Sequence, residues 1–268
     1  LMITVILLVI VGGISLSQAV SDPHQVTLRW LRLGGIIAVT LLAVAVTIEM
    51  SRLGRSSVGS LAVLTEPELQ STDWALLTLT ATVLMIQLTA TQKAKHQIQR
   101  RAAGCGFLLA SGTAGIIVTH HLTTAINLPS IAFTTALSAG LVGGTLMTML
   151  LGHAYLTAGN EMTQKPFMRL LLMVIILLAL RLIFSAMWGG YSYYTSSRTG
   201  PNSWNLMMIM TRYLVGFGVP SVFAYMTYDC IKRRANQSAT GILYITYVMV
   251  IIGEGAALAL LGATGWAF

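Results

Sequence analysis

The sequence contains eight long apolar runs, separated by short polar or glycine-rich stretches. A helix that spans a lipid bilayer needs about 20 mostly apolar residues, and each run is close to that length. The runs lie at residues 2–18, 33–50, 74–91, 103–122, 130–154, 168–188, 205–229 and 240–262. This pattern predicts an all-α fold, a polytopic transmembrane bundle of eight helices with short loops.

Composition agrees with this fold class. Hydrophobic residues make up 55% of the 268 residues and charged residues only 9%, whereas a soluble domain carries about 45–50% apolar and about 25% charged residues. These proportions exclude a soluble enzyme. The net charge of +8 is typical of basic cytoplasmic loops, so we expect no nucleic-acid partner. The expected setting is the bacterial cytoplasmic (inner) membrane, with lipid bound at the protein surface.

The run at 2–18 has an alternative interpretation, because a short apolar N-terminal segment can be a secretory signal peptide. We expect it to be a true membrane-spanning helix. We also expect one integral membrane domain over 1–268. An Arg-Arg-Ala sequence at 100–102 recurs at 233–235, four spans later, which suggests a division into halves 1–125 and 126–268.

Basic residues fix the expected orientation, because cytoplasmic loops are enriched in lysine and arginine. The loops after spans 2, 4 and 6 hold Arg52, Arg55 and Arg198. The loops after spans 1, 3, 5 and 7 and the helix starts beside them hold Arg29, Arg32, Lys93, Lys95, Arg100, Arg101, Lys165, Arg169, Lys232, Arg233 and Arg234. Both termini are therefore expected on the non-cytoplasmic side.

Three charged residues lie in the interior of the expected spans, away from their ends: Arg181, Arg212 and Glu254. A charge within the bilayer is costly, so each is a candidate for function. With about 1.5 Å of rise per residue, all three fall roughly 10 Å below the outer surface. Two interpretations follow. The charges lock three helices together, or one arginine neutralises Glu254 and the other holds an anion, a haem propionate or a quinone carbonyl.

His120 and His121 end the fourth span, about 6 Å below the same surface by the same rise. Adjacent residues on a helix point about 100° apart, so we expect only one of them to face the charged layer. Both join the three charged residues as candidate quinone- or ligand-binding groups. His120, His121 and His153 are the candidate ligands of one haem b, because too few histidines lie on helices for two haems.

Small residues recur every four positions along the fifth span, at Ala132, Ala136, Gly140, Gly144, Thr148 and Gly152. Such a stripe lets another helix approach closely, and we assign it to helix packing. The alternative is a flat ligand lying against the stripe. Pro220, in the sequence Gly-Phe-Gly-Val-Pro, predicts a bend in the seventh span.

The sequence lacks Walker A, HExxH and GxSxG motifs, so it carries no catalytic motif of its own. Cys105 and Cys230 have no CxxC or Cys/His spacing, and we expect no metal. Whether the chain is an enzyme stays open, since it could be the quinone-reactive subunit of an oxidoreductase.

Our leading hypothesis is a membrane subunit of a larger respiratory or other electron-transfer complex. It would anchor extrinsic and membrane subunits and bind a quinone or one haem b in the outer leaflet. Two alternatives remain open at this point. One is a secondary transporter or channel for a small anionic or zwitterionic solute, in which the Pro220 bend is a hinge. The other is a purely structural membrane subunit.

Overall fold

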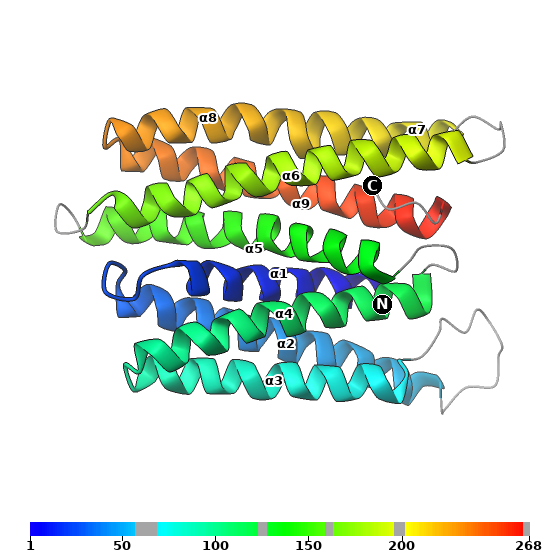
Figure 1. Cartoon of the computed structure of the whole chain (residues 1–268), viewed down its shortest axis with the longest axis horizontal. Helices are drawn as coiled ribbons and strands as arrows, with labels where there is room; N and C mark the ends of the chain where they lie inside the picture. Colours follow the sequence, from blue (N-terminus) through cyan, green and yellow to red (C-terminus); the bar gives the residue numbers. More distant parts are fainter. Residues whose placement is uncertain (57–68, 123–127, 159–162, 196–201, 265–268) are drawn as a thin grey trace.

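The structure is a computed structural model of the chain (Figure 1). It describes residues 1–56, 69–122, 128–158, 163–195 and 202–264. Within these ranges the chain forms helices and no strand. The helices are α1 (Met2–Val20), α2 (Leu28–Ser56), α3 (Ser71–Gln92), α4 (His96–Leu122), α5 (Leu128–Ala158), α6 (Lys165–Thr195), α7 (Ser203–Met210), the π-helix η2 (Thr211–Gly218), α8 (Val219–Lys232) and α9 (Asn236–Thr264).

Eight of the described segments are long and apolar enough to cross a membrane, because α7, η2 and α8 together form one span over Ser203–Lys232. The prediction of an all-helical bundle with eight spans is confirmed at this level. The helices extend past the apolar runs at several ends. For example, α2 begins at Leu28, which brings Arg29 and Arg32 into its first turns. The polar ends belong to the helices because their backbone hydrogen bonds continue beyond the apolar stretch.

Helices α1 and α5 lie side by side in the middle of the bundle, with α2–α4 on one side and α6–α9 on the other (Figure 1). Helix α1 packs against α2, α4 and α5, while α5 packs against α4, α6 and α9. One hydrophobic core joins the two groups and contains Leu8 and Ile117 as well as Phe167 and Leu243. The expected division near residue 125 falls within 123–127, outside the described residues.

The closest approach of α1 and α5 depends on glycine at two positions. A Cβ atom added to Gly13 would lie 2.6 Å from the Cα of Gly143, and one added to Gly143 would lie 2.5 Å from the Cα of Gly13. Both distances are far below van der Waals contact, and the atoms met are backbone. Only glycine at both positions permits this crossing.

The stripe of small residues that recurs every four positions on α5 does not form this crossing. Gly140 and Gly144 face the side chains of Leu177 and Met173 on α6, and Gly152 lies against Thr240 and Phe167. Ala136 of the same stripe is half-buried. Helix α5 is covered on several faces, since 89% of its most apolar 18-residue stretch is buried.

Two turns at the same end of the bundle have matching geometry. Ala94 between α3 and α4 has φ 51°, and Arg234 between α8 and α9 has φ 59°. After them, Lys95 N–H donates to the Ala90 carbonyl over 2.9 Å, and Ala235 N–H donates to the Cys230 carbonyl over 2.8 Å. The two Arg-Arg-Ala sequences do not occupy matching positions in these two turns. The first lies within α4, whereas the second forms the turn before α9.

Candidate functional site

Three buried charges meet between α6, η2 and α9. Arg212 Nη1 donates to Glu254 Oε1 over 2.8 Å, and Arg181 Nη2 donates to Glu254 Oε2 over 3.2 Å. Ser138 of α5 completes the group, because its hydroxyl donates to Glu254 Oε2 over 2.8 Å and accepts from Arg181 Nε over 3.1 Å. The structure thus brings together the three charges that the sequence places in one layer. We call this group, with Ser138, the Glu254 centre.

Glycines on both sides of Glu254 shape the surroundings of its carboxylate. Gly253 crosses Gly216 of η2 so closely that a Cβ on Gly216 would lie 2.6 Å from the Gly253 Cα. This crossing brings the backbone that carries Arg212 against the backbone that carries Glu254. On the other side, an added Cβ on Gly255 would meet no atom within 4 Å.

Arg212 lies on a π-helical segment, and Pro220 follows directly in the first turn of α8. A proline lacks an N–H, and its ring clashes with the carbonyl four residues earlier, which here belongs to Gly216. The wider π turn is a known way to absorb such a conflict, and it often occurs at functional sites. The structure therefore has an eight-residue π segment at the place where the sequence predicts a bend.

A cavity of about 50 Å³ adjoins the Glu254 centre. Most of its wall is apolar and comes from α1, α4, α5 and α9. The polar wall residues are Thr134, Thr135, Ser138, Arg181 and Glu254. A buried water needs about 10–15 Å³ by this measure, so the cavity has room for about three or four waters or one small ion. Pockets for drug-sized ligands measure about 300–1,000 Å³. The cavity is therefore too small for a quinone ring or a haem.

The Glu254 centre has an excess of positive charge, since two arginines share one carboxylate. Both arginines are almost fully buried, with exposed fractions of 1% for Arg181 and 0% for Arg212. Among the described residues, Nε and Nη2 of Arg212 find no hydrogen-bond partner. The Arg212 guanidinium instead lies over the Phe217 ring, 4.2 Å from its centroid, a contact that stabilises a cation only partly. With both arginines charged, the Glu254 centre carries one net positive charge.

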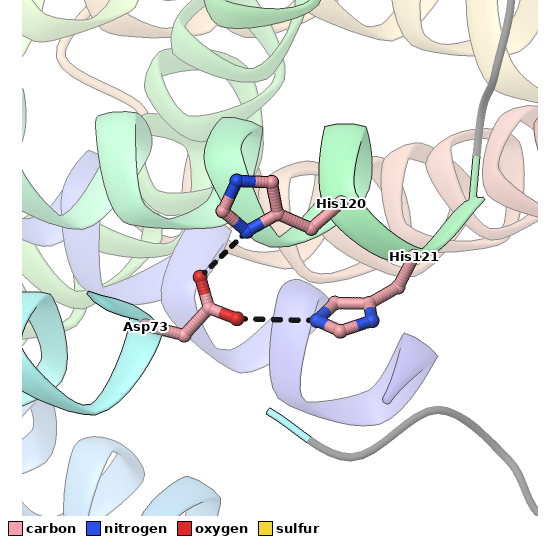
Figure 2. A group of neighbouring side chains, drawn as sticks. All are labelled: Asp73, His120 and His121. Atoms are coloured by element: carbon pink, nitrogen blue, oxygen red, sulfur yellow. Dashed lines mark hydrogen bonds and ion pairs between the residues drawn. The ribbon is translucent and has the colours of Figure 1, made fainter. Parts of the chain in front are cut away.

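A second polar group lies at the end of the bundle where α3 begins and α4 ends, and Figure 2 shows both of its imidazoles pointing toward one carboxylate. His120 Nδ1 lies 3.1 Å from Asp73 Oδ1, and His121 Nε2 lies 3.1 Å from Asp73 Oδ2. From the sequence we expected only one of the two histidines to face the charged layer. In the structure both histidines contact Asp73 on α3 instead, and no contact joins either of them to the Glu254 centre among the described residues. We call this group the Asp73 triad.

The remaining candidate haem ligand, His153, is exposed near the end of α5. His120 and His121 are neighbours on one helix and share one carboxylate, so they are not placed to hold the two faces of a porphyrin. At the far end of the bundle, the rings of His24 and His96 lie 4.8 Å apart. This geometry lends no support to a haem site.

Two participants were not singled out from the sequence as site residues. Ser138 lies on the apolar fifth span among many small residues, and only contact with Glu254 distinguishes it. Asp73 opens α3, where its carboxylate accepts from the Gln70 N–H over 3.0 Å and caps the helix. The sequence clue to Asp73 was its expected depth in the membrane, because Asp73 and the two histidines all lie within one helical turn of the same expected membrane surface.

Comparison with known proteins finds no family model, no curated protein and no solved structure that matches this chain. Its function therefore has to be inferred from its own residues.

Proposed function

We propose that the chain is a membrane carrier for a small monovalent anion, which binds in the cavity beside the Glu254 centre. The observation that carries the proposal is the unbalanced positive charge of two buried arginines around one carboxylate. A net charge buried among apolar helices is costly, and a bound anion removes that cost. The cavity volume of about 50 Å³ limits the substrate to ions such as chloride, nitrate or formate.

The helices around the site supply a means of movement. Arg212 lies on the π segment, between the Gly216–Gly253 crossing and the helix start at α7. A π segment followed by proline has weaker backbone hydrogen bonding than a regular helix, so a change of shape there costs less. We infer that this segment shifts when the anion enters or leaves. Interrupted helices with substrate-binding charges are typical of secondary transporters.

The proposed setting is the bacterial cytoplasmic membrane, with both termini outside. In this orientation Glu254 lies nearer the outer end of α9, because ten residues separate it from Thr264 and eighteen from Asn236, or about 15 Å against about 27 Å along the helix. An anion would reach it from the outside over the shorter distance.

Anion uptake into vesicles tests the proposal. The purified chain in liposomes should carry chloride, nitrate or formate without any partner protein. Arg181→Gln removes the excess charge but leaves an amide that can bond to Ser138 and Glu254, so we expect uptake to fall at least tenfold. The matched control is Arg233→Gln at an exposed position, where the side chain is 74% exposed. Equal uptake by Arg181→Gln and the control would contradict the proposal.

The electron-transfer subunit is our second proposal. It is favoured by the poor burial of the Ser203–Lys232 span, since only 22% of its most apolar 18-residue stretch is buried. Its exposed Met207, Leu214 and Tyr225 offer a surface for another membrane subunit as well as for lipid. The same purified sample distinguishes the two proposals. Stoichiometric bound quinone or a haem b band on reduction, together with no anion uptake, would replace the carrier by the subunit.

A further inference from the structure

We propose that the Asp73 triad binds a divalent transition metal, with Zn²⁺ as the expected ion. The triad supplies two imidazole nitrogens and a carboxylate, which is the donor set of many three-ligand zinc sites. The three ligand atoms lie within 4.8 Å of one another, on the consecutive helices α3 and α4. The inference is independent of anion transport, because the triad makes no contact with the Glu254 centre among the described residues.

The distances between the donor atoms suit a shared metal. Zinc bonds to nitrogen and oxygen measure about 2.0–2.2 Å, and two ligands of a tetrahedral zinc then lie about 3.3 Å apart. The two nitrogen–oxygen separations in the triad are both 3.1 Å. Because His120 contacts Oδ1 and His121 contacts Oδ2, a shared metal would require the carboxylate to bind through both oxygens or to rotate, and the two imidazoles to draw closer together.

The surroundings of the carboxylate resemble the outer shell of a metal site. Asp73 is fully buried, and its Oδ2 also accepts from the Gln70 N–H. A hydrogen bond of this kind fixes the orientation of a ligating carboxylate. The two histidines lie in the last turn of α4, where the helix dipole favours a cation.

Burial differs among the three ligands in a way that gives a metal access. The His121 side chain is 3% exposed, whereas the His120 side chain is 32% exposed. A metal would therefore enter past His120, and its fourth position would face solvent. Three protein ligands and one open position are typical of zinc sites that bind water or an exogenous ligand. A simple ion pair between α3 and α4 would need only one histidine, so it would not explain why both histidines contact Asp73.

Metal titration of the full chain tests the inference. The purified protein is stripped with a chelator and titrated with Zn²⁺ against a competing indicator, and with Co²⁺ for its visible absorption. We expect one equivalent to bind, with tetrahedral cobalt bands. His120→Ala should weaken binding at least 100-fold, since it removes a ligand. His153→Ala, which removes an exposed histidine from α5, is the matched control and should bind as the wild type does.

Two results would overturn the metal site: no stoichiometric binding to the wild type, or equal affinity in His120→Ala and wild type. Folding is checked separately, because the metal-free thermal midpoint of His120→Ala should match that of the metal-free wild type. His121→Ala and Asp73→Asn extend the test if they fold. Anion uptake by His120→Ala should stay at the wild-type rate, so failure of this inference is distinct from failure of the carrier proposal.

Discussion

At the scale of single residues, Glu254 has more partners than a carboxylate in an ordinary ion pair. It accepts from two arginines and from Ser138, and each of its oxygens is engaged. A buried ion pair adds little net stability compared with apolar residues of similar volume, but removal of one partner leaves an uncompensated charge. Removing one member of the centre and replacing all its charged members together therefore have different expected effects on stability. Comparing the two kinds of variant separates a structural role of the centre from a functional one.

Glu254→Gln should destabilise the protein by about 3–5 kcal/mol, because two buried guanidiniums lose their counter-charge. Thermal unfolding in detergent measures the change. Chloride or formate should restore more stability to this variant than to the wild type, since an anion can replace the missing carboxylate. The matched control is Asp229→Asn, which removes a carboxylate from an exposed pair with Arg233 and should change stability by less than about 1 kcal/mol.

A variant in which Arg181, Arg212 and Glu254 are all replaced by methionine addresses the purely structural alternative. Its stability should stay close to that of the wild type, while anion uptake should be lost. If the chain is purely structural, neither the wild type nor the triple variant takes up anions, and both are equally stable. Full uptake by this triple variant would therefore contradict the carrier proposal.

Sequence and structure agree for some of these residues and not for others. The common depth of Arg181, Arg212 and Glu254 was predictable from helix rise, but their contact also depends on α6, η2 and α9 being neighbours. The pairing of His120 and His121 with Asp73 was not predictable, because depth says nothing about which helices are neighbours. Angular position on α4 alone suggested that the two histidines diverge. The flexible side chains converge on a carboxylate that lies between their directions.

At the scale of helices, the crossing of α1 and α5 is the tightest contact that the sequence left unspecified. The small residues of α5 predicted close packing, but several faces of this helix carry small residues. The crossing uses Gly143, one position away from the four-residue stripe. Which face is closest depends also on α1, where Gly13 meets Gly143 and the Ala139 carbonyl.

Gly143→Ala should therefore be strongly destabilising. The added Cβ would meet backbone atoms of Gly13 at 2.5 Å, and backbone cannot rotate away as a side chain can. We expect a loss of at least about 2–3 kcal/mol, at the upper end of what overpacking costs. Gly104→Ala on α4 is the matched control, since its added Cβ meets nothing within 4 Å. It should leave the thermal midpoint unchanged or raise it, and equal midpoints for the two variants would contradict the crossing.

At the scale of the whole molecule, the bundle has two unlike ends. The turns Lys93–Lys95 and Arg233–Ala235 lie at one end with the starts of α2 and α6, and eleven of the sixteen basic residues gather there. The Asp73 triad lies at the other end (Figures 1 and 2). This separation of charge follows from the connectivity of the eight spans, and so the eight apolar runs were enough to predict it.

The charge asymmetry predicts that the basic end faces the cytoplasm. In a background in which Cys105 and Cys230 are replaced by serine, Ser203→Cys at the start of α7 should react with a membrane-impermeant maleimide in intact bacterial cells. Lys95→Cys in the α3–α4 turn should react only after the membrane is opened. Both positions are exposed, so lack of reaction reports the side of the membrane. The reverse pattern would place the Glu254 centre nearer the cytoplasmic side and the Asp73 triad at the cytoplasmic surface. A carrier would then receive its anion from inside over the shorter distance, and the triad would draw on the scarce free zinc of the cytoplasm.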